Sequence, residues 1–155
     1  MPRRNVARLV MGWILASVFG VVPASSQAAT TGDVIAAQIN KIRAAKGLKR
    51  LRVMPRLSAA ARNHSTNLAR SGSLNHNGFS QRIDAARIPG LHTAGENVAY
   101  ITGCGPSSAK VIVKMWMASA PHRRNILSPS FRMIGAGAAL RGRCGATFAT
   151  AEFAG

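Results

Sequence analysis

The sequence predicts an α+β fold, with helices first and an antiparallel hairpin at the end of the chain. Apolar residues recur at helical spacing in several segments before residue 118. From Arg132 onward the pattern changes to alternating or small apolar residues, over 132–140 and 144–153, on either side of Arg141-Gly142-Arg143. Two such segments around a glycine-containing turn are typical of a β-hairpin. We therefore expect helices to pack on the faces of a terminal antiparallel sheet.

Two long helices are predicted in the first half of the chain. Residues 33–46 place apolar side chains at helical spacing, and Gly47 ends the segment. A short extended stretch, 52–55, leads to a second helix over 57–71. His64 lies on the apolar face of this second helix, where we expect a buried and hydrogen-bonded histidine and no ligand role.

Shorter elements are predicted in the middle of the chain. Ser80 is expected to cap a short helix that runs through Ala86. Residues 91–99 are expected to be irregular, and Ser107 or Ser108 to cap a third main helix.

We expect the fold to bring polar side chains from other parts of the chain close to the stretch 115–127. Its apolar helical pattern stops before Pro121, which has no N–H group and fits the first turn of a helix. His122 is therefore predicted in the first turn of a new short helix, held by rigid backbone on both sides.

The beginning of the chain has the pattern of a secretory leader. Arg3, Arg4 and Arg8 precede an apolar run over 9–22, and small residues follow up to Ala28. Positive charge, a short apolar run and small residues in this order are typical of a signal peptide, and the run is short for a membrane span of about 20 residues.

The sequence thus predicts a signal peptide over residues 1–28 and one folded domain over 29–155. An uncleaved membrane anchor is the alternative for the first segment. With cleavage, we expect a secreted or periplasmic protein that touches membranes only peripherally, and we expect a monomer.

The chain is strongly basic. Lys and Arg total 21 against 4 Asp and Glu, for a formal net charge of +17. Such a charge indicates affinity for anionic surfaces such as lipid headgroups, acidic polysaccharide or nucleic acid, although a generally basic surface is the simpler alternative. Aromatic residues make up only 5% of the chain and no nucleic-acid-binding motif is present, so we expect no specific nucleic-acid partner.

Cys104 and Cys144 are the two cysteines of the chain. In an exported protein an even pair favours a disulfide, and closing this long loop is worth roughly 4 kcal/mol on the loop-entropy account. Two free buried thiols are the alternative, and two cysteines so far apart do not form a structural zinc site by themselves.

Glu96 stands out among the four acidic residues because it lies between Gly95 and Asn97 in a basic chain. It is a candidate metal ligand or general base, and the alternative is a structural carboxylate that accepts backbone or arginine hydrogen bonds. His76 and His122 each follow a predicted helix closely. Two His and one Glu with an open position match a catalytic zinc shell, but the spacing of a His-Glu-x-x-His helix is absent.

Five motifs follow one another in a distinctive order: Leu74-Asn75-His76, Gly95-Glu96-Asn97-Val98-Ala99, Trp116-Met117-Ala118-Ser119, His122-Arg123-Arg124-Asn125-Ile126-Leu127 and Ile134-Gly135-Ala136-Gly137. Together they resemble the CAP superfamily of cysteine-rich secretory proteins, antigen 5 and pathogenesis-related 1 proteins, also called the SCP domain. The resemblance is to its short bacterial branch, and it spans nearly all of 33–155.

The resemblance implies an α-β-α sandwich with a central antiparallel sheet of three to four strands. It also implies a cleft with two His and two acidic residues, which binds a divalent metal such as zinc in some members. His76, Glu96 and His122 match three of these positions. The fourth, usually Glu in animal and plant members, is Ser119 here, which leaves the cleft less anionic.

Three functions follow as hypotheses. The first is a non-enzymatic binding module for lipid or anionic envelope components, with a cleft able to take a divalent metal. The second is a hydrolase that uses zinc, or that uses Ser119 as nucleophile with His122 as base and Glu96 to orient it. The third is a structural polar network of His76, Glu96, Ser119 and His122, which is compatible with the first. The sequence leaves open whether the protein is an enzyme and favours the non-enzymatic binding module.

Overall fold

A computed structural model describes residues 29–155, so the predicted signal peptide lies outside the described residues. Within this range no helix is both long and apolar enough to cross a membrane. The elements are α1 (Thr31–Ala45), β1 (Arg52–Val53), α2 (Pro55–Ser71), α3 (Phe79–Ala85), β2 (Ala94–Thr102), α4 (Ser108–Ala118), α5 (Ala120–Leu127), β3 (Met133–Arg141) and β4 (Ala146–Ala154).

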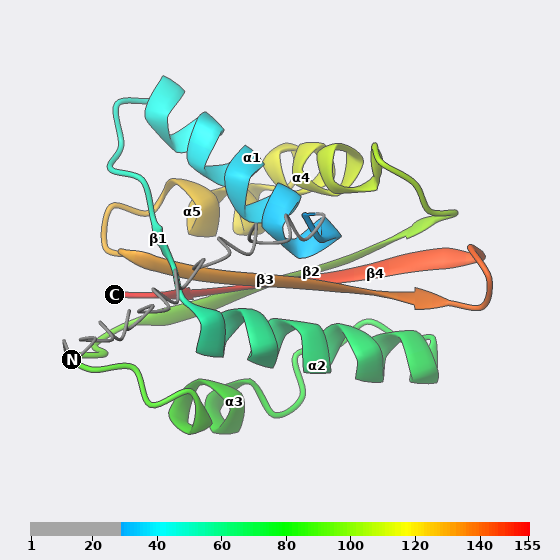
Figure 1. Cartoon of the computed structure of the whole chain (residues 1–155). Helices are drawn as coiled ribbons and strands as arrows, with labels where there is room; N and C mark the ends of the chain where they lie inside the picture. Colours follow the sequence, from blue (N-terminus) through cyan, green and yellow to red (C-terminus); the bar gives the residue numbers. More distant parts are fainter. Residues whose placement is uncertain (1–28) are drawn as a thin grey trace, which may run out of the picture.

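The molecule is a three-layer sandwich (Figure 1). A four-stranded sheet with strand order β1-β3-β4-β2 forms the middle layer, α1, α4 and α5 cover one face, and α2 and α3 cover the other. The β3–β4 hairpin is antiparallel, and β2 joins β4 antiparallel. The predicted α+β sandwich is confirmed, with one addition: β1 pairs with β3 in parallel, so the sheet is mixed.

The prediction that residues 91–99 are irregular was wrong. Ala94–Thr102 forms strand β2, which pairs with β4 over nine residues. Glycine, glutamate and asparagine favour strands weakly, so the segment lacks the local signal of a strand. Pairing with the apolar strand β4 overrides that weak propensity.

Two helix starts also differ from expectation. The α3 helix begins at Phe79 after Gly78, which has φ of 71°, and Ser80 therefore lies inside the helix and does not cap it. The α2 helix begins at Pro55, two residues earlier than expected. Proline fits the first helical position because its missing N–H would have no helical partner there. The short helix predicted after residue 119 is confirmed as α5, with Pro121 in its first turn.

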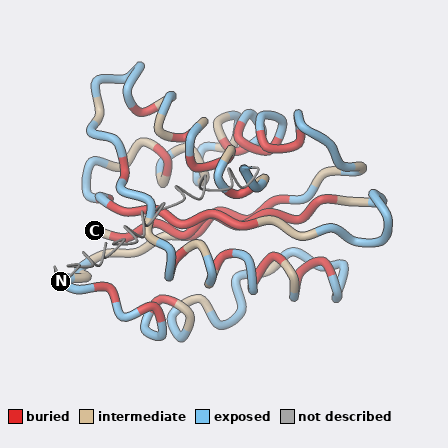
Figure 2. Tube along the Cα trace, in the orientation of Figure 1, coloured by how far each residue is buried: buried red, intermediate tan, exposed pale blue. Residues whose placement is uncertain are grey.

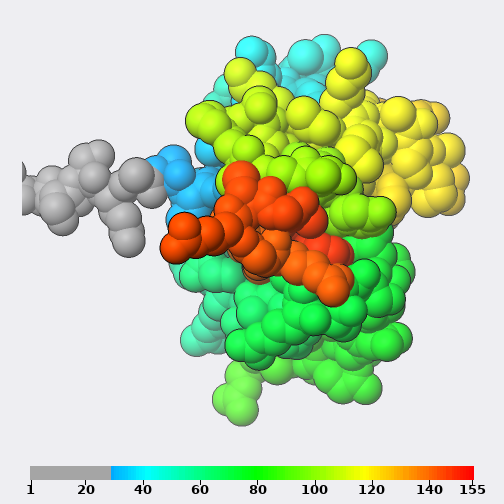
Figure 3. All heavy atoms as spheres, turned by 90° about the vertical axis from the view of Figure 1, so that its right-hand side faces the viewer, coloured from blue at the N-terminus to red at the C-terminus, as the bar shows by residue number. Residues whose placement is uncertain are grey.

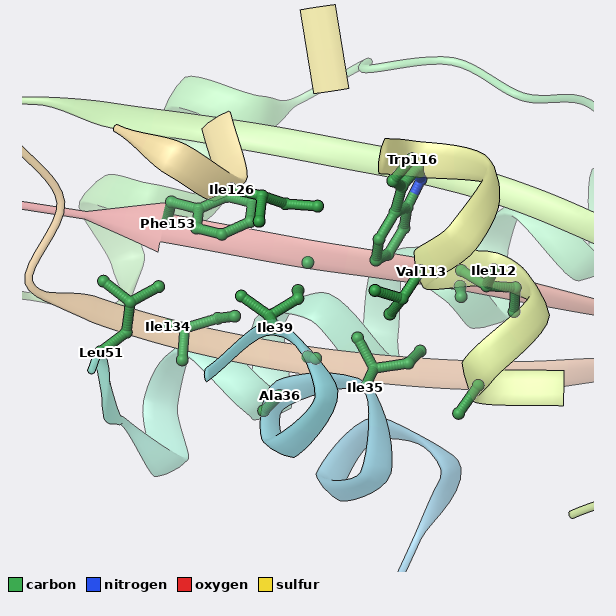
Figure 4. Packing of buried hydrophobic residues seen from close by; sticks show 14 of the residues in the cluster. Ile35, Ala36, Ile39, Leu51, Ile112, Val113, Trp116, Ile126, Ile134 and Phe153 are labelled. Carbon is green, nitrogen blue, oxygen red and sulfur yellow. The ribbon is translucent and has the colours of Figure 1, made fainter. Parts of the chain in front are cut away.

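The main core lies between the sheet and the layer of α1, α4 and α5. Figure 2 shows most of β4, the middle of β2 and the first part of β3 as buried, and Figure 4 shows how the side chains of this core meet. Trp116 of α4 packs near Ile35 and Ile39 of α1, with Ile134 and Phe153 from the sheet below. Fully burying such side chains is worth about 1.5–3 kcal/mol each, so this layer supplies much of the stabilisation.

On the other face, two glycines let α2 approach β3 very closely. A Cβ atom on Gly135 would lie 2.1 Å from the backbone of Leu57, and one on Gly137 would lie 2.3 Å from the backbone nitrogen of Arg62. Neither contact is possible between real atoms, so only glycine permits this spacing. The close approach packs the mainly apolar face of α2, which also carries His64 and Ser65, against the sheet.

The predicted disulfide is confirmed. Cys104 and Cys144 are bonded, with their Cα atoms 5.0 Å apart. The bond joins the β2–α4 connection to the β3–β4 turn, at the end of the molecule that faces the viewer in Figure 3.

We predict that Gly135→Ala destabilises the protein by about 3 kcal/mol, because the new methyl group forces α2 away from the sheet. The measurement is the free energy of unfolding from urea denaturation. Gly90→Ala is the control: no atom lies within 4 Å of its Cβ position, and its left-handed φ of 67° costs an L-residue only about 1 kcal/mol. Equal losses in the two variants would contradict a role for the close approach.

Candidate functional site

Two glutamates face each other on neighbouring strands in the interior of the protein. Glu96 on β2 is directly opposite Glu152 on β4, and both are buried. Two like charges at such a position repel each other and are costly to remove from water. The surrounding residues must therefore neutralise them.

Arg82 of α3 supplies most of this neutralisation. Its Nη2 atom pairs with Glu96 Oε2, and its Nε donates to Glu152 Oε1 at 3.2 Å. The same guanidinium donates to the backbone carbonyl of Asn77, which holds the start of α3 in place. One arginine thus bridges two buried carboxylates on two strands.

The remaining charge is removed by a proton. Burial, followed by the negative charge of Glu96, raises the pKa of Glu152 to about 8. Glu152 Oε2 receives no hydrogen bond from any donor of the described residues, but a protonated carboxyl group here can itself donate to Glu96. At neutral pH the pair therefore carries one negative charge opposite one guanidinium.

Two histidines complete the surroundings of Glu96. His76 Nδ1 lies 2.6 Å from Glu96 Oε1, and 56% of the His76 side chain is exposed, so this ring connects the buried carboxylate to solvent. His64 Nε2 donates to the carbonyl oxygen of Asn75 at 2.9 Å, and it lies 3.8 Å from Glu96 Oε2. Burial lowers the pKa of His64, which favours the neutral ring.

Asparagine side chains fix α5 against β2 beside this cluster. Asn97 Nδ2 donates to the carbonyl oxygen of His122 at 3.1 Å, and Asn125 Nδ2 donates to the carbonyl oxygen of Glu96 at 3.1 Å and to Asn97 Oδ1 at 2.9 Å. His122 is half-buried, and burial followed by the charge of His76 lowers its pKa.

A buried arginine holds the other end of α5. Arg43 of α1 donates to the carbonyl oxygens of Ile126 and Ser128, each at 2.8 Å, and to that of Lys49 at 2.9 Å. It is 1% exposed, and its partners here are backbone carbonyls at the end of the helix. A positive charge at a helix C-terminus is stabilising, so Arg43 ties α1 to the helix that carries His122.

The profile of the cysteine-rich secretory protein (CAP) family matches residues 36–153. The chain belongs to the CAP family.

Similar proteins occur in bacteria. The CAP domain is 35% identical over 102 residues to the protein YkwD of Bacillus subtilis, a match that covers 63% of this chain and 38% of YkwD. An extracellular protein with an SCP domain from Bacillus anthracis is 23% identical with a TM-score of 0.66, covering 80% of this chain and 40% of that one. This chain thus spans about two fifths of the length of both proteins.

An outer surface protein of Borrelia burgdorferi matches over more of its own length. It is 18% identical with a TM-score of 0.66, and the match covers 78% of this chain and 89% of that one. At this identity the likeness concerns the fold.

The structure brings together some of the site residues expected from the sequence. His76 contacts Glu96, and the backbone carbonyl of His122 accepts a hydrogen bond from Asn97, the residue after Glu96. Ser119 forms the junction between α4 and α5, and no hydrogen bond joins its hydroxyl group to His122 among residues 29–155. His64 is buried and hydrogen-bonded, as predicted.

Sequence reasoning missed Arg82 and Glu152, which complete the polar cluster. A signal for Glu152 was present, because each of only four acidic residues in so basic a chain needs a partner. The sequence gave no signal for Arg82, since 17 other Lys and Arg residues follow residue 40 and no pattern sets Arg82 apart from them.

The residues that the family resemblance assigns to a metal site do not form a metal shell in this arrangement. No three His, Cys, Asp or Glu side chains within 29–155 are placed to hold a metal ion together. Glu96 already pairs with the guanidinium of Arg82 and with His76, and a cation next to the carboxylate opposes the binding of a second cation. Metal binding at His76, Glu96 and His122 therefore stays a prediction.

We predict that stability falls as the pH rises from 6.5 to 8.5. Glu152 has a pKa of about 8 in the folded protein and an ordinary value of 4.5, so its contribution is complete below 4.5 and is lost as the pH rises through 8. The lowered pKa values of His64 and His122 act at lower pH, where stability is lost as the rings are forced to protonate.

The measurement is the urea midpoint of the wild type and of Glu152→Gln across this pH range. Glutamine keeps the shape and remains neutral, so its midpoint should change less with pH than that of the wild type. Parallel curves for the two proteins would show that Glu152 does not titrate in this range.

Proposed function

We propose that this CAP domain is a non-enzymatic binding module outside the cytoplasm that attaches to anionic envelope components, above all to lipid membranes. The distribution of charge is the observation that carries the proposal. Of the 18 Lys and Arg after residue 28, Arg43 is buried, Arg82 and Arg123 are half-buried, and the other 15 are exposed. Of the four acidic residues, only Asp33 and Asp84 are exposed.

The internal site supports binding over catalysis. Both oxygen atoms of Glu96 are engaged by Arg82 and His76, and its side chain is 2% exposed, so it is poorly placed to activate a water molecule. A Ser-His pair needs a hydrogen bond between its members, and none joins Ser119 to His122 in the described part of the chain.

Three observations of different kinds support a place of action outside the cytoplasm. The first residues have the pattern of a signal peptide, Cys104 and Cys144 form a disulfide, and the relatives from B. anthracis and B. burgdorferi are described as extracellular and outer-surface proteins. Disulfides persist in oxidising compartments outside the cytoplasm.

An apolar hollow near this disulfide, lined by Val34, Ala109 and Leu140 among others, is a further feature that suits a lipid ligand.

We predict that the purified protein binds vesicles of phosphatidylglycerol and phosphatidylcholine in equal parts, and that binding weakens strongly between about 50 and 200 mM salt, because salt screens exposed charges. Co-sedimentation with the vesicles measures it. Vesicles of phosphatidylcholine alone are the control, and we expect little binding to them. Equal binding to both, or binding unaffected by salt, would contradict the proposal.

A divalent metal is the second candidate, and the 2.6 Å contact between His76 Nδ1 and Glu96 Oε1, two potential ligand atoms, is the observation that favours it. When bound, a metal ion such as zinc would supply Lewis-acid chemistry for a hydrolase. His76, His122 and Glu96 would hold it, provided that the Glu96 carboxylate is released from Arg82.

We predict that the wild type takes up less than one zinc ion per chain, and that Arg82→Gln takes up more, because the guanidinium no longer competes for Glu96. Calorimetry and elemental analysis measure the uptake. The gain should vanish in Arg82→Gln/His122→Ala if the histidine is a ligand. Stoichiometric zinc in the wild type that is lost in His122→Ala would instead favour the hydrolase and justify a substrate screen.

A further inference from the structure

Six exposed cationic side chains gather along one edge of the sandwich, far from the disulfide. We call this set the basic edge. It follows the second half of α1, the connection to β1, β1 itself and the start of α2, all along the left side of Figure 1. Its members are Lys41, Lys46, Lys49, Arg50, Arg52 and Arg56, and no acidic residue occurs between the first and the last of them.

Buried hydrogen bonds hold the backbone of the basic edge in place. Asn40 donates to the carbonyl oxygen of Leu51 at 2.9 Å and accepts from its N–H at 2.7 Å. The buried Arg43 donates to the carbonyl oxygen of Lys49. The connection is thus fixed to α1 at two points, and binding a partner requires little further ordering of the chain.

Charge is combined with exposed apolar surface at this edge. A groove between α1 and β1 is lined by Lys41, Arg50 and Val53, and Val53 is 46% exposed. Asp33 also borders the groove, but its carboxylate accepts hydrogen bonds from the backbone and hydroxyl group of Thr30, and these lower its pKa. The acidic group is therefore engaged at the start of α1, and the middle of the groove stays cationic.

We infer that the basic edge is the surface by which the protein docks on an anionic lipid bilayer. The inference rests on the proposed function and names the surface responsible for it. Clusters of four to eight Lys and Arg attract anionic bilayers, each residue contributing about 1 kcal/mol close to the surface. An exposed apolar side chain among the cations suits the boundary between headgroups and acyl chains and adds nothing to the binding of a soluble polyanion, which makes the bilayer the favoured partner.

The test compares two variants of equal charge. The edge variant Lys41→Gln/Lys46→Gln/Lys49→Gln/Arg50→Gln removes four exposed cations whose side chains make no hydrogen bond in the described structure. The control variant Arg70→Gln/Lys110→Gln/Lys114→Gln/Arg143→Gln removes four exposed cations from α2, α4 and the β3–β4 turn, which surround the face seen in Figure 3. Circular dichroism and thermal unfolding verify that both fold.

We expect the edge variant to bind vesicles of equal parts phosphatidylglycerol and phosphatidylcholine about 1000-fold more weakly than the wild type, and the control variant to stay within about threefold of it. Similar losses in both variants would overturn the inference and leave the proposed function intact, because binding would then follow net charge alone. Absence of vesicle binding by the wild type would overturn both.

Heparin in place of vesicles distinguishes a soluble polyanion from a bilayer. Val53→Ser is expected to weaken vesicle binding several-fold and to leave heparin binding unchanged, since only the bilayer accepts the apolar side chain. An edge variant that loses heparin binding while its vesicle binding is unchanged would overturn the inference in favour of a polymeric partner.

Discussion

The arrangement of the layer formed by α2 and α3 depends on one interaction, the pairing of Arg82 with Glu96 and Glu152. Two carboxylates that face each other across β2 and β4 cannot be buried without a compensating charge. The guanidinium that provides this charge belongs to α3, a short helix whose Ile83 also packs in an apolar cluster with Met133 and Ala154 of the sheet. The ion pair helps to hold α3 in place. It thereby also holds the connection between α2 and α3, which places His76 against Glu96.

A second constraint is purely steric. Because Gly135 and Gly137 have no side chains, α2 lies almost on the backbone of β3, which positions His64 close to Glu96. On the opposite face, Arg43 binds the backbone carbonyls at the end of α5 and holds the helix of His122. The polar cluster thus receives its members from both layers of helices.

These constraints separate the charges of the protein. The interior holds the two carboxylates that form the ion-paired cluster, and the surface keeps nearly all of the cations. A carboxylate saturated by internal partners stabilises the fold, whereas unpaired surface cations are available to an external partner. The chain has few acidic residues, and half of them are buried. This explains both why the carboxylates of the candidate site are already ion-paired and why the surface is basic.

Much of this organisation is visible in the sequence. The helical spacing over 33–46 and 57–71 and the change of period after Arg132 predicted the α+β sandwich, because local patterns of apolar residues report which side of an element is buried. Short motifs likewise indicated His76 and Glu96 as members of a cleft.

Local patterns do not report contacts between distant segments. Strand β2 was missed because its stability comes from pairing with β4 and not from its own residues. Glu152 lies 56 positions after Glu96 and Arg82 lies 14 positions before it, and only the register of β2 with β4 and the docking of α3 bring the three together. The sequence by itself determined the fold class, the net charge and the identity of the reactive side chains. The tertiary structure alone decided which of them are neutralised inside and which face solvent, because burial and ion pairing are properties of spatial neighbours.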